Sequence, residues 1–217
     1  MAFGFSQNNF NDFGEKNGIW HGYHDNGSVK YRGEFLNGKE IGAFHYYDLS
    51  GYNVITLNYI DTGVTSLATL FHLNGKVKCK GKYINKKKEG LWSYYNENEI
   101  LTSNENYING ALDGSVTFYN ENQSGEIVLT EKYMYAAGLK HGIVEIFYPS
   151  GFLNMRGNYK NGKLDGVVEY YYNNSNLKIE SKGSYSEGLK DSIWIFFGES
   201  GDTLKSVMFQ SGSMLID

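Results

Sequence analysis

The sequence predicts an all-β protein in which tandem β-hairpins form one elongated, twisted antiparallel sheet. Three observations predict this fold: a period of about 24 residues, aromatic residues at two fixed positions of each period, and strand-like alternation between turn-forming sequences. The period gives eight repeats over residues 18–216. We therefore expect a repeat domain at residues 18–217, preceded by an N-terminal cap or disordered segment at residues 1–17.

Each repeat begins at a glycine or serine, and positions are counted from that residue. The starts are Gly18, Gly42, Ser66, Gly90, Gly114, Gly142, Gly166 and Ser192, with a four-residue insertion in repeat five. Position +5 is always aromatic: Tyr23, Tyr47, Phe71, Tyr95, Tyr119, Phe147, Tyr171 and Phe197. The position seven before the next start is also always aromatic: Phe35, Tyr59, Tyr83, Tyr107, Tyr135, Tyr159, Tyr185 and Phe209. Eight aromatics from eight would arise by chance about once in two million per position, so the repeat is real.

Repeat one shows the elements of every repeat in order. Residues 18–23 form the first strand, and Asp25-Asn26-Gly27 forms a turn, because Asn and Gly tolerate positive φ. Residues 28–35 form the second strand, in which apolar residues and Gly33 alternate with polar residues at a period of two. Asn37-Gly38 closes the repeat with a second turn. No segment has a sustained helical period, so we expect essentially no helix.

Some repeats depart from this pattern. Leu57 and Thr62 replace glycines in repeat two, and Glu99 and Glu105 replace glycines in repeat four. We expect local irregularity, including bulges, around residues 55–68 and 97–106.

Composition and charge exclude several classes of protein. The formal net charge is −4 and the pI about 5.8, which disfavours nucleic-acid binding and adsorption to anionic membranes. A single cysteine, Cys79, excludes an internal disulfide and a cysteine-based zinc site. Residues 1–13 lack a basic segment followed by an apolar run, so we expect a cytoplasmic protein. A signal peptide removed from the chain is the alternative.

No constellation of residues predicts catalysis, a metal site or a cofactor. His21 and His45 share a repeat position, but they lie two strands apart, roughly 10 Å, which is too far to share one metal. Glu89, Asp113, Asp165 and Asp191 recur just before a repeat start, where an acidic residue is ordinary turn chemistry. Cys79 shares its strand face with apolar neighbours. We therefore expect a protein that is not an enzyme.

Two groups of side chains are candidates for binding. The first is aromatic, at positions +2 and +4, and comprises Trp20, Phe44, Tyr46, Trp92, Tyr94, Phe118, Tyr170 and Trp194. The alternative for this group is that every column only packs the sheet. The second is a basic patch of Lys76, Lys78, Lys80, Lys82, Lys86, Lys87 and Lys88, which suits an acidic partner, a phosphate-bearing ligand or anionic lipid. Its alternative is a solvated face that discourages edge pairing.

The ends of the sheet need protection, because an unpaired strand edge can pair with another chain. We expect Phe3, Phe5, Phe10 and Phe13 to cap the first hairpin. Met214, Leu215 and Ile216 are expected to cap the last hairpin or to mediate self-association.

The repeat G-x-W-x-x-Y-(x3)-G-(x5)-G-x-Y-x-N-G-x-x-x-G resembles the MORN (membrane occupation and recognition nexus) repeat. Residues 142–166, GIVEIFYPSGFLNMRGNYKNGKLDG, fit best, and residues 18–42 fit nearly as well. The chain is most similar to the bacterial MORN-variant group often labelled YwqK-type antitoxins. That resemblance implies a sheet of hairpins and an antitoxin association, but the matching residues are those that build the sheet.

These observations favour a scaffold that binds a protein partner through an extended sheet surface, in an antitoxin- or immunity-like role. One alternative is a carbohydrate or cell-surface binding repeat, because Tyr and Trp ladders can stack on sugars. Another is an anionic-lipid scaffold that uses the Lys76–Lys88 patch.

Overall fold

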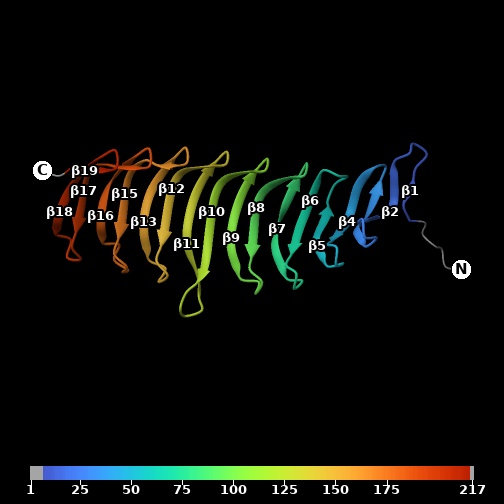
Figure 1. Cartoon of the computed structure of the whole chain (residues 1–217), viewed down its shortest axis with the longest axis horizontal. Coiled ribbons are helices and arrows are strands. Elements are labelled where there is room, and N and C mark those ends of the chain that lie inside the picture. Colours follow the sequence, from blue (N-terminus) through green and yellow to red (C-terminus); the bar gives the residue numbers. More distant parts are fainter. Residues whose placement is uncertain (1–6, 216–217) are drawn as a thin grey trace. The chain divides into compact units, whose positions relative to one another are not determined.

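The computed structural model describes residues 7–215 and confirms the all-β fold. The strands form a 19-stranded antiparallel sheet of sequential hairpins, and Figure 1 shows the hairpins following one another in chain order. No residue within this range is helical. Accordingly, no helix in the described range is long and apolar enough to cross a membrane.

The chain divides into two compact parts, each described here by itself. The N-terminal part ends at residue 101 and also includes residues 107–110. Its strands are β1 (Asn9–Phe10), β2 (Lys16–Tyr23), β3 (Val29–Leu36), β4 (Lys39–Tyr47), β5 (Asn53–Tyr59), β6 (Thr65–Phe71), β7 (Val77–Ile84) and β8 (Lys87–Tyr95). Each strand from β1 to β7 pairs antiparallel with the next. β9 (Leu101–Ile108) contributes residues to both parts.

The C-terminal part comprises residues 102–106 and the chain from residue 111. Its strands are β10 (Ala111–Glu121), β11 (Ile127–Ala136), β12 (Leu139–Phe147), β13 (Leu153–Lys160), β14 (Lys163–Leu164), β15 (Gly166–Tyr171), β16 (Ile179–Ser186), β17 (Leu189–Phe197), β18 (Thr203–Gln210) and β19 (Ser213–Leu215). All sixteen strands that eight repeats predict are present, with the first strand of repeat seven split into β14 and β15. β1 and β19 are additional short strands.

The turn that closes seven of the eight repeats has the two-residue type I′ form, with positive φ at both central residues. Repeat two is the exception, because residues 60–64 form a longer connection in which only Gly63 has positive φ. Asn37 and Gly38 have φ of 47° and 75°, and Asn161 and Gly162 have φ of 51° and 85°. The glycine amide of such a turn donates to the backbone carbonyl of the residue two before the repeat start, as from Gly38 to Lys16 at 2.8 Å. These turns therefore fix the register within a repeat and join it to its neighbour.

Bulges recur at fixed positions rather than where the repeat is irregular. Seven hairpins shift register between positions +4 and +5, as between Gly22 and Tyr23. A second shift lies near the repeat start, where Gly42 has φ of 62°. The bulge expected around residues 55–68 is wrong for the pairing of β5 with β6, which is regular from Ile55 to Tyr59. The reason is that Ser66 does not adopt the positive φ of the glycine starts.

The core lies on one face of the sheet, which we call the inner face because it carries position +2. The residues at this position are Trp20, Phe44, Ala68, Trp92, Val116, Val144, Val168 and Trp194, and only 0–8% of each is exposed. Neighbouring aromatics enclose them edge-on, as Tyr83 does Trp92 with ring centroids 4.9 Å apart. A single sheet can bury these side chains because each is covered by its neighbours in the same face.

Rings at position +2 lie over a glycine of the preceding strand. A methyl group at Gly81 would lie 2.3 Å from the ring of Trp92, and one at Gly183 would lie 2.3 Å from the ring of Trp194. Where the glycine is replaced, the +2 residue is small, as in Leu57 opposite Ala68. The small Ala68 of repeat three therefore leaves room for Leu57, which replaces the glycine in repeat two.

The predicted caps are present in part. β1 pairs with β2, and the ring of Phe10 packs edge-on against Trp20 at 5.0 Å, whereas Phe13 is 88% exposed. Met214 and Leu215 belong to β19, which pairs with β18 and leaves both side chains about half exposed. Phe3, Phe5 and Ile216 lie outside the described residues.

Candidate interaction surfaces

The structure separates the eight aromatic candidates into two groups. Trp20, Phe44, Trp92 and Trp194, at position +2, are buried in the stack and form the core of the sheet. Tyr46, Tyr94, Phe118 and Tyr170, at position +4, lie on the same face but are only half-buried. Position +4 is therefore the column of this group that solvent or a partner can reach.

The half-buried tyrosines form hydroxyl contacts along the inner face. The hydroxyls of Tyr94 and Tyr107 lie 3.4 Å apart, and Lys88 donates to both. The hydroxyls of Tyr170 and Tyr185 lie 3.5 Å apart in the C-terminal part. Burial raises the pKa of Tyr170 well above its ordinary value, so the Tyr170 hydroxyl stays protonated at neutral pH.

A pocket of about 310 Å³ lies on the inner face of the N-terminal part. It is lined by Glu40, Tyr46, Ile55, Leu57, Tyr59, Gly63, Val64, Ser66, Tyr83 and Lys86. The pocket adjoins the place where Ala68 takes the +2 position, which is Phe44 and Trp92 in the neighbouring repeats. Glu40 was not predicted from the sequence as a site residue, although it stands where four other repeats carry lysine.

The predicted basic patch is divided between surfaces. Alternation along β7 places Lys78, Lys80 and Lys82 on the face opposite the buried Cys79, which we call the outer face. Lys86 lies in the closing turn and lines the inner-face pocket. Lys88 lies on the inner face, with its ammonium 4.8 Å from the Trp92 ring centroid. The turn at residues 85–86 and the alternation along β8 cause this division.

Histidine side chains link neighbouring repeats along the side of the sheet opposite the closing turns. His24 Nε2 lies 2.9 Å from the carbonyl oxygen of Tyr47, and His72 Nε2 lies 2.8 Å from that of Tyr95. The hydroxyl of Tyr148 makes the same link by donating to the Tyr171 carbonyl at 2.9 Å. Each bond joins position +6 of one repeat to position +5 of the next. His45 instead contacts the Thr56 hydroxyl at 3.1 Å through Nδ1.

The carboxylates before the repeat starts act in the closing turns. Glu89 accepts a hydrogen bond from the amide of Asn109 at 2.9 Å, and Asp113 accepts one from the amide of Ala137 at 3.1 Å. Asp191 makes the equivalent, longer contact with the amide of Ser211 at 3.4 Å. These three carboxylates thus bind the turn of the following repeat, which agrees with their interpretation as turn residues.

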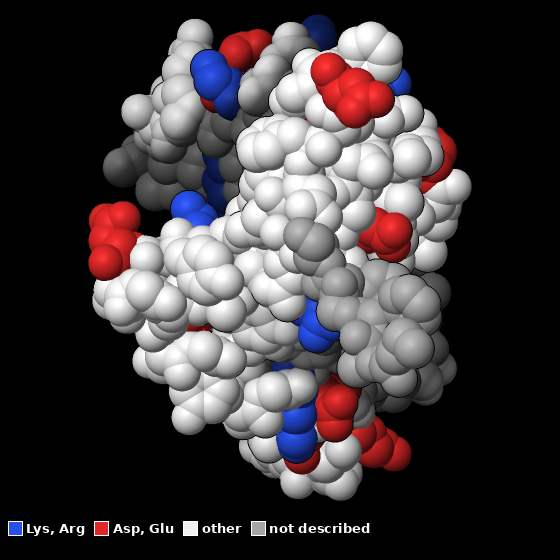
Figure 2. Space-filling view, turned by 90° about the vertical axis from the view of Figure 1, so that its right-hand side faces the viewer, with Lys and Arg blue, Asp and Glu red and all other residues white. Residues whose placement is uncertain are grey.

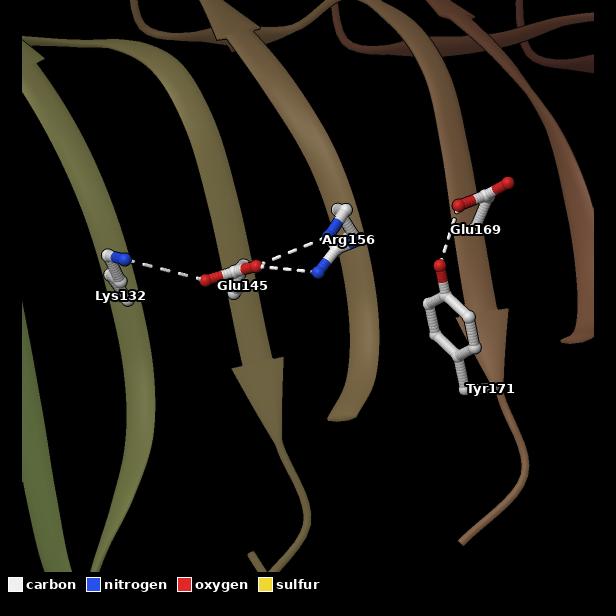
Figure 3. Close-up of polar contacts among 5 residues, drawn as sticks. All are labelled: Lys132, Glu145, Arg156, Glu169 and Tyr171. Atoms are coloured by element: carbon white, nitrogen blue, oxygen red, sulfur yellow. Dashed lines mark hydrogen bonds and ion pairs between the residues drawn. The ribbon is translucent and has the colours of Figure 1, made fainter. Parts of the chain in front are cut away.

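Charged residues alternate in sign across four outer-face strands of the C-terminal part (Figure 3). Glu145 on β12 accepts from Arg156 at 3.0 and 3.2 Å and forms an ion pair with Lys132 at 3.7 Å. The Tyr171 hydroxyl donates to Glu169 at 2.6 Å, and burial with this bond raises the pKa of Tyr171 to about 12. On the face shown in Figure 2, basic and acidic side chains are likewise interspersed.

The remaining titratable side chains show no arrangement typical of a catalytic or metal site. Across residues 7–215, no three His, Cys, Asp or Glu side chains are grouped so that they could hold a metal ion. Cys79 is buried beside Ala68 and Trp92.

The MORN repeat variant family matches the chain at residues 16–37, 140–161 and 164–182. These segments are similar to MORN-variant repeats. They fall in repeats one, six and seven, and include the two repeats whose sequences fit the pattern best. No curated protein matches the chain significantly. The matched segments contain turn and core residues described above, so the match supports a repeat scaffold and assigns no binding residue.

Proposed function

We propose that the chain is a non-enzymatic scaffold that binds a protein partner through the inner face of its repeats, in an antitoxin- or immunity-like role. The observation that carries the proposal is the half-buried column at position +4, namely Tyr46, Tyr94, Phe118 and Tyr170. Aromatic side chains that are partly open and held on rigid strands are typical anchors of protein interfaces. The net charge of −4 favours a basic partner.

Affinity capture from the native cell tests this proposal. The tagged chain should retain one protein in stoichiometric amount, and the double variant Tyr46→Ser/Tyr94→Ser should lose it while remaining folded by circular dichroism. The matched control is Leu67→Ser/Leu91→Ser, which removes two outer-face side chains that are 48% and 54% exposed. Retention by the inner-face variant and loss by the control would place the interface on the other face. Capture of no protein would contradict the proposal and favour a carbohydrate ligand.

A second candidate function is association with anionic lipid through the outer face of the N-terminal part. Lys80 and Lys82 flank the exposed Leu67 and Leu91 around a groove of about 500 Å³. Basic side chains beside exposed aliphatic ones suit a membrane surface, although the acidic net charge opposes it.

Vesicle co-sedimentation tests the lipid candidate. The chain should bind vesicles that contain phosphatidylserine but not vesicles of phosphatidylcholine alone, and Lys78→Glu/Lys80→Glu/Lys82→Glu should abolish the binding. Equal binding to both vesicle types, or no binding, would exclude this function.

A further inference from the structure

The inner face has a position that a lysine of the protein occupies in four of the eight repeats. Two residues before the start, four repeats carry a lysine whose ammonium lies over aromatic rings: Lys16, Lys88, Lys140 and Lys190. The ammonium of Lys16 lies 4.6 Å from the Trp20 ring centroid, and that of Lys190 lies 4.1 Å from that of Trp194. A cation in contact with aromatic faces is attracted by their electrons, so this position is built for a positive charge.

Repeats two and three lack this internal cation. Glu40 and Val64 stand at the equivalent position, while the aromatic column is kept as Tyr59 and Tyr83. Leu112 and Leu164 also replace the lysine, but only Glu40 puts a negative charge there. Repeat two therefore keeps the rings of the cation position and adds a carboxylate to it.

The pocket of about 310 Å³ described above lies at this place. A pocket of this size is at the lower end of the range for small-molecule sites, about 300–1,000 Å³, and it suits a single long side chain. It is lined by three tyrosine rings, from Tyr46, Tyr59 and Tyr83, and by aliphatic residues of β5. Its walls can therefore pack both the stem and the charged end of such a side chain.

The carboxylate of Glu40 has no cation of its own. Among residues 7–215, no lysine, arginine or histidine lies within ion-pair distance of it. Its negative charge, together with burial, raises the pKa of Tyr46 and Tyr59. Lys86 lines the pocket but is exposed, and it makes neither an ion pair with Glu40 nor a contact over an aromatic ring. The pocket is thus aromatic and contains a carboxylate that forms no ion pair within the described residues.

We propose that this pocket binds the charged end of a lysine or arginine side chain of the partner protein, with Glu40 as counter-ion and Tyr46 and Tyr59 as the aromatic wall. The inference rests on the proposed scaffold function and names the chemistry by which the partner is recognised. The partner's cation takes the place that Lys16, Lys88, Lys140 and Lys190 fill in their own repeats.

The test uses small probes on the full chain, observed by the amide resonances of residues 40, 46, 59, 63 and 83. Nα-acetyl-arginine methylamide and Nα-acetyl-lysine methylamide should cause saturable shifts there that weaken with added salt, whereas the uncharged Nα-acetyl-norleucine methylamide should not. Equal shifts by norleucine would overturn the proposal. Shifts by tetramethylammonium but by neither amino-acid probe would also overturn it, in favour of a free quaternary ammonium ligand.

Matched variants sharpen the test. Glu40→Lys restores the lysine of the other repeats and should abolish probe binding, whereas Glu34→Lys makes the same charge change on the outer face and should weaken it less than twofold. Lys86→Gly should strengthen binding several-fold, because it removes the competing charge from a residue with φ of 63°. Undiminished probe binding by Glu40→Lys would overturn the proposal.

The two proposals fail in different ways. If the probes bind and no protein is captured, the pocket is a cation site but the scaffold function is wrong. If a protein is captured by the wild type and equally by Glu40→Lys, the scaffold function stands and the pocket assignment is wrong.

Discussion

Serine at a repeat start adopts two different backbone conformations. Ser192 has φ of 60°, as the glycine starts do, whereas Ser66 does not have a positive φ. The left-handed region is unfavourable for residues with a Cβ, by roughly 1–2 kcal/mol. Ser192 is therefore strained, and Ser66 is relaxed in a regular ladder opposite Tyr59.

Replacing Ser192 by glycine should stabilise the protein. We expect Ser192→Gly to raise the free energy of unfolding by about 0.5–1 kcal/mol, because relief of the left-handed strain exceeds the entropy cost of glycine. Urea denaturation followed by circular dichroism measures the change. Ser66→Gly is the matched control and should lower stability by about 0.5–1 kcal/mol, because glycine weakens a regular strand. Changes of the same sign in both variants would contradict this account.

At the scale of neighbouring strands, glycine and ring sizes are matched across the inner face. Gly81 lies under Trp92, and Leu57 pairs with the much smaller Ala68. In each pair one residue is small where the other is large, although the ladder is regular at Leu57–Ala68 and shifts register at Gly81. The sum of the two side-chain volumes therefore matters more than the identity of either residue.

The Leu57–Ala68 pair of repeats two and three can be placed at the equivalent positions of repeats three and four, Gly81 and Trp92, to test this matching. We expect Gly81→Leu to destabilise the protein by about 3 kcal/mol or more through overlap with Trp92, and Trp92→Ala by about 3–5 kcal/mol through a cavity. In the double variant the leucine fills that cavity, so its loss should fall short of the sum by at least about 1 kcal/mol. Thermal and urea denaturation of the four proteins measure the coupling. Additive losses would show that the residues do not share one space.

The ion pairs between strands differ in their surroundings. Only 17% of the Glu145 side chain is exposed, and it lies between Lys132 and Arg156. The Lys163–Glu187 pair is open to solvent, with side chains 58% and 71% exposed. Solvent screens the second pair far more than the first.

Neutralising Glu145 should therefore matter more than neutralising Glu187. We expect Glu145→Gln to lower the free energy of unfolding by about 1–2 kcal/mol, because it leaves two cations side by side and weakens charged hydrogen bonds. Glu187→Gln, the control, should change it by less than about 0.5 kcal/mol. Denaturation at low and high NaCl measures both effects. Equal losses in the two variants would contradict the role given to burial.

At the scale of the whole molecule, tyrosine burial makes the fold sensitive to alkali. Burial is the main cause that raises the pKa of eight tyrosines on both parts of the chain: Tyr46, Tyr59, Tyr83, Tyr133, Tyr135, Tyr159, Tyr170 and Tyr171. A group with a raised pKa in the folded state contributes its full stabilisation below its unfolded pKa, about 10 for tyrosine. That contribution is lost as the pH rises above this value towards the folded pKa.

We expect the melting temperature to be nearly constant between pH 7 and 9 and to fall steeply above about pH 10. Tyrosinate absorbance at 295 nm should rise together with loss of the β-sheet circular dichroism signal, because most buried tyrosines ionise only on unfolding. Complete ionisation near pH 10 with an intact sheet signal would contradict this prediction.

Much of the fold could be predicted from the sequence because a hairpin repeat is determined by local chemistry. The aromatic columns indicated the length of the repeat, and the alternation of apolar and polar residues indicated the strands. Asn-Gly pairs such as Asn37-Gly38 indicated turns with positive φ. The role of Glu89 and Asp113 in the turns was also predictable from their place before glycine. The regular pairing of β5 with β6, in place of the expected bulge, was not predictable, because pairing with the adjacent strand selects the backbone conformation of Ser66.

The sequence by itself determined the all-β hairpin repeat, since each turn and each alternation depends on residues close together in the chain. Only the tertiary structure decided the depth of each aromatic column. Alternation places Trp92 and Tyr94 on one face, but the space over Gly81 in the neighbouring strand buries the first and leaves the second half-open. The pocket beside Glu40 was decided in the same way, because it is formed by side chains from four strands and their turns, whose spacing in the chain does not reveal what lies between them.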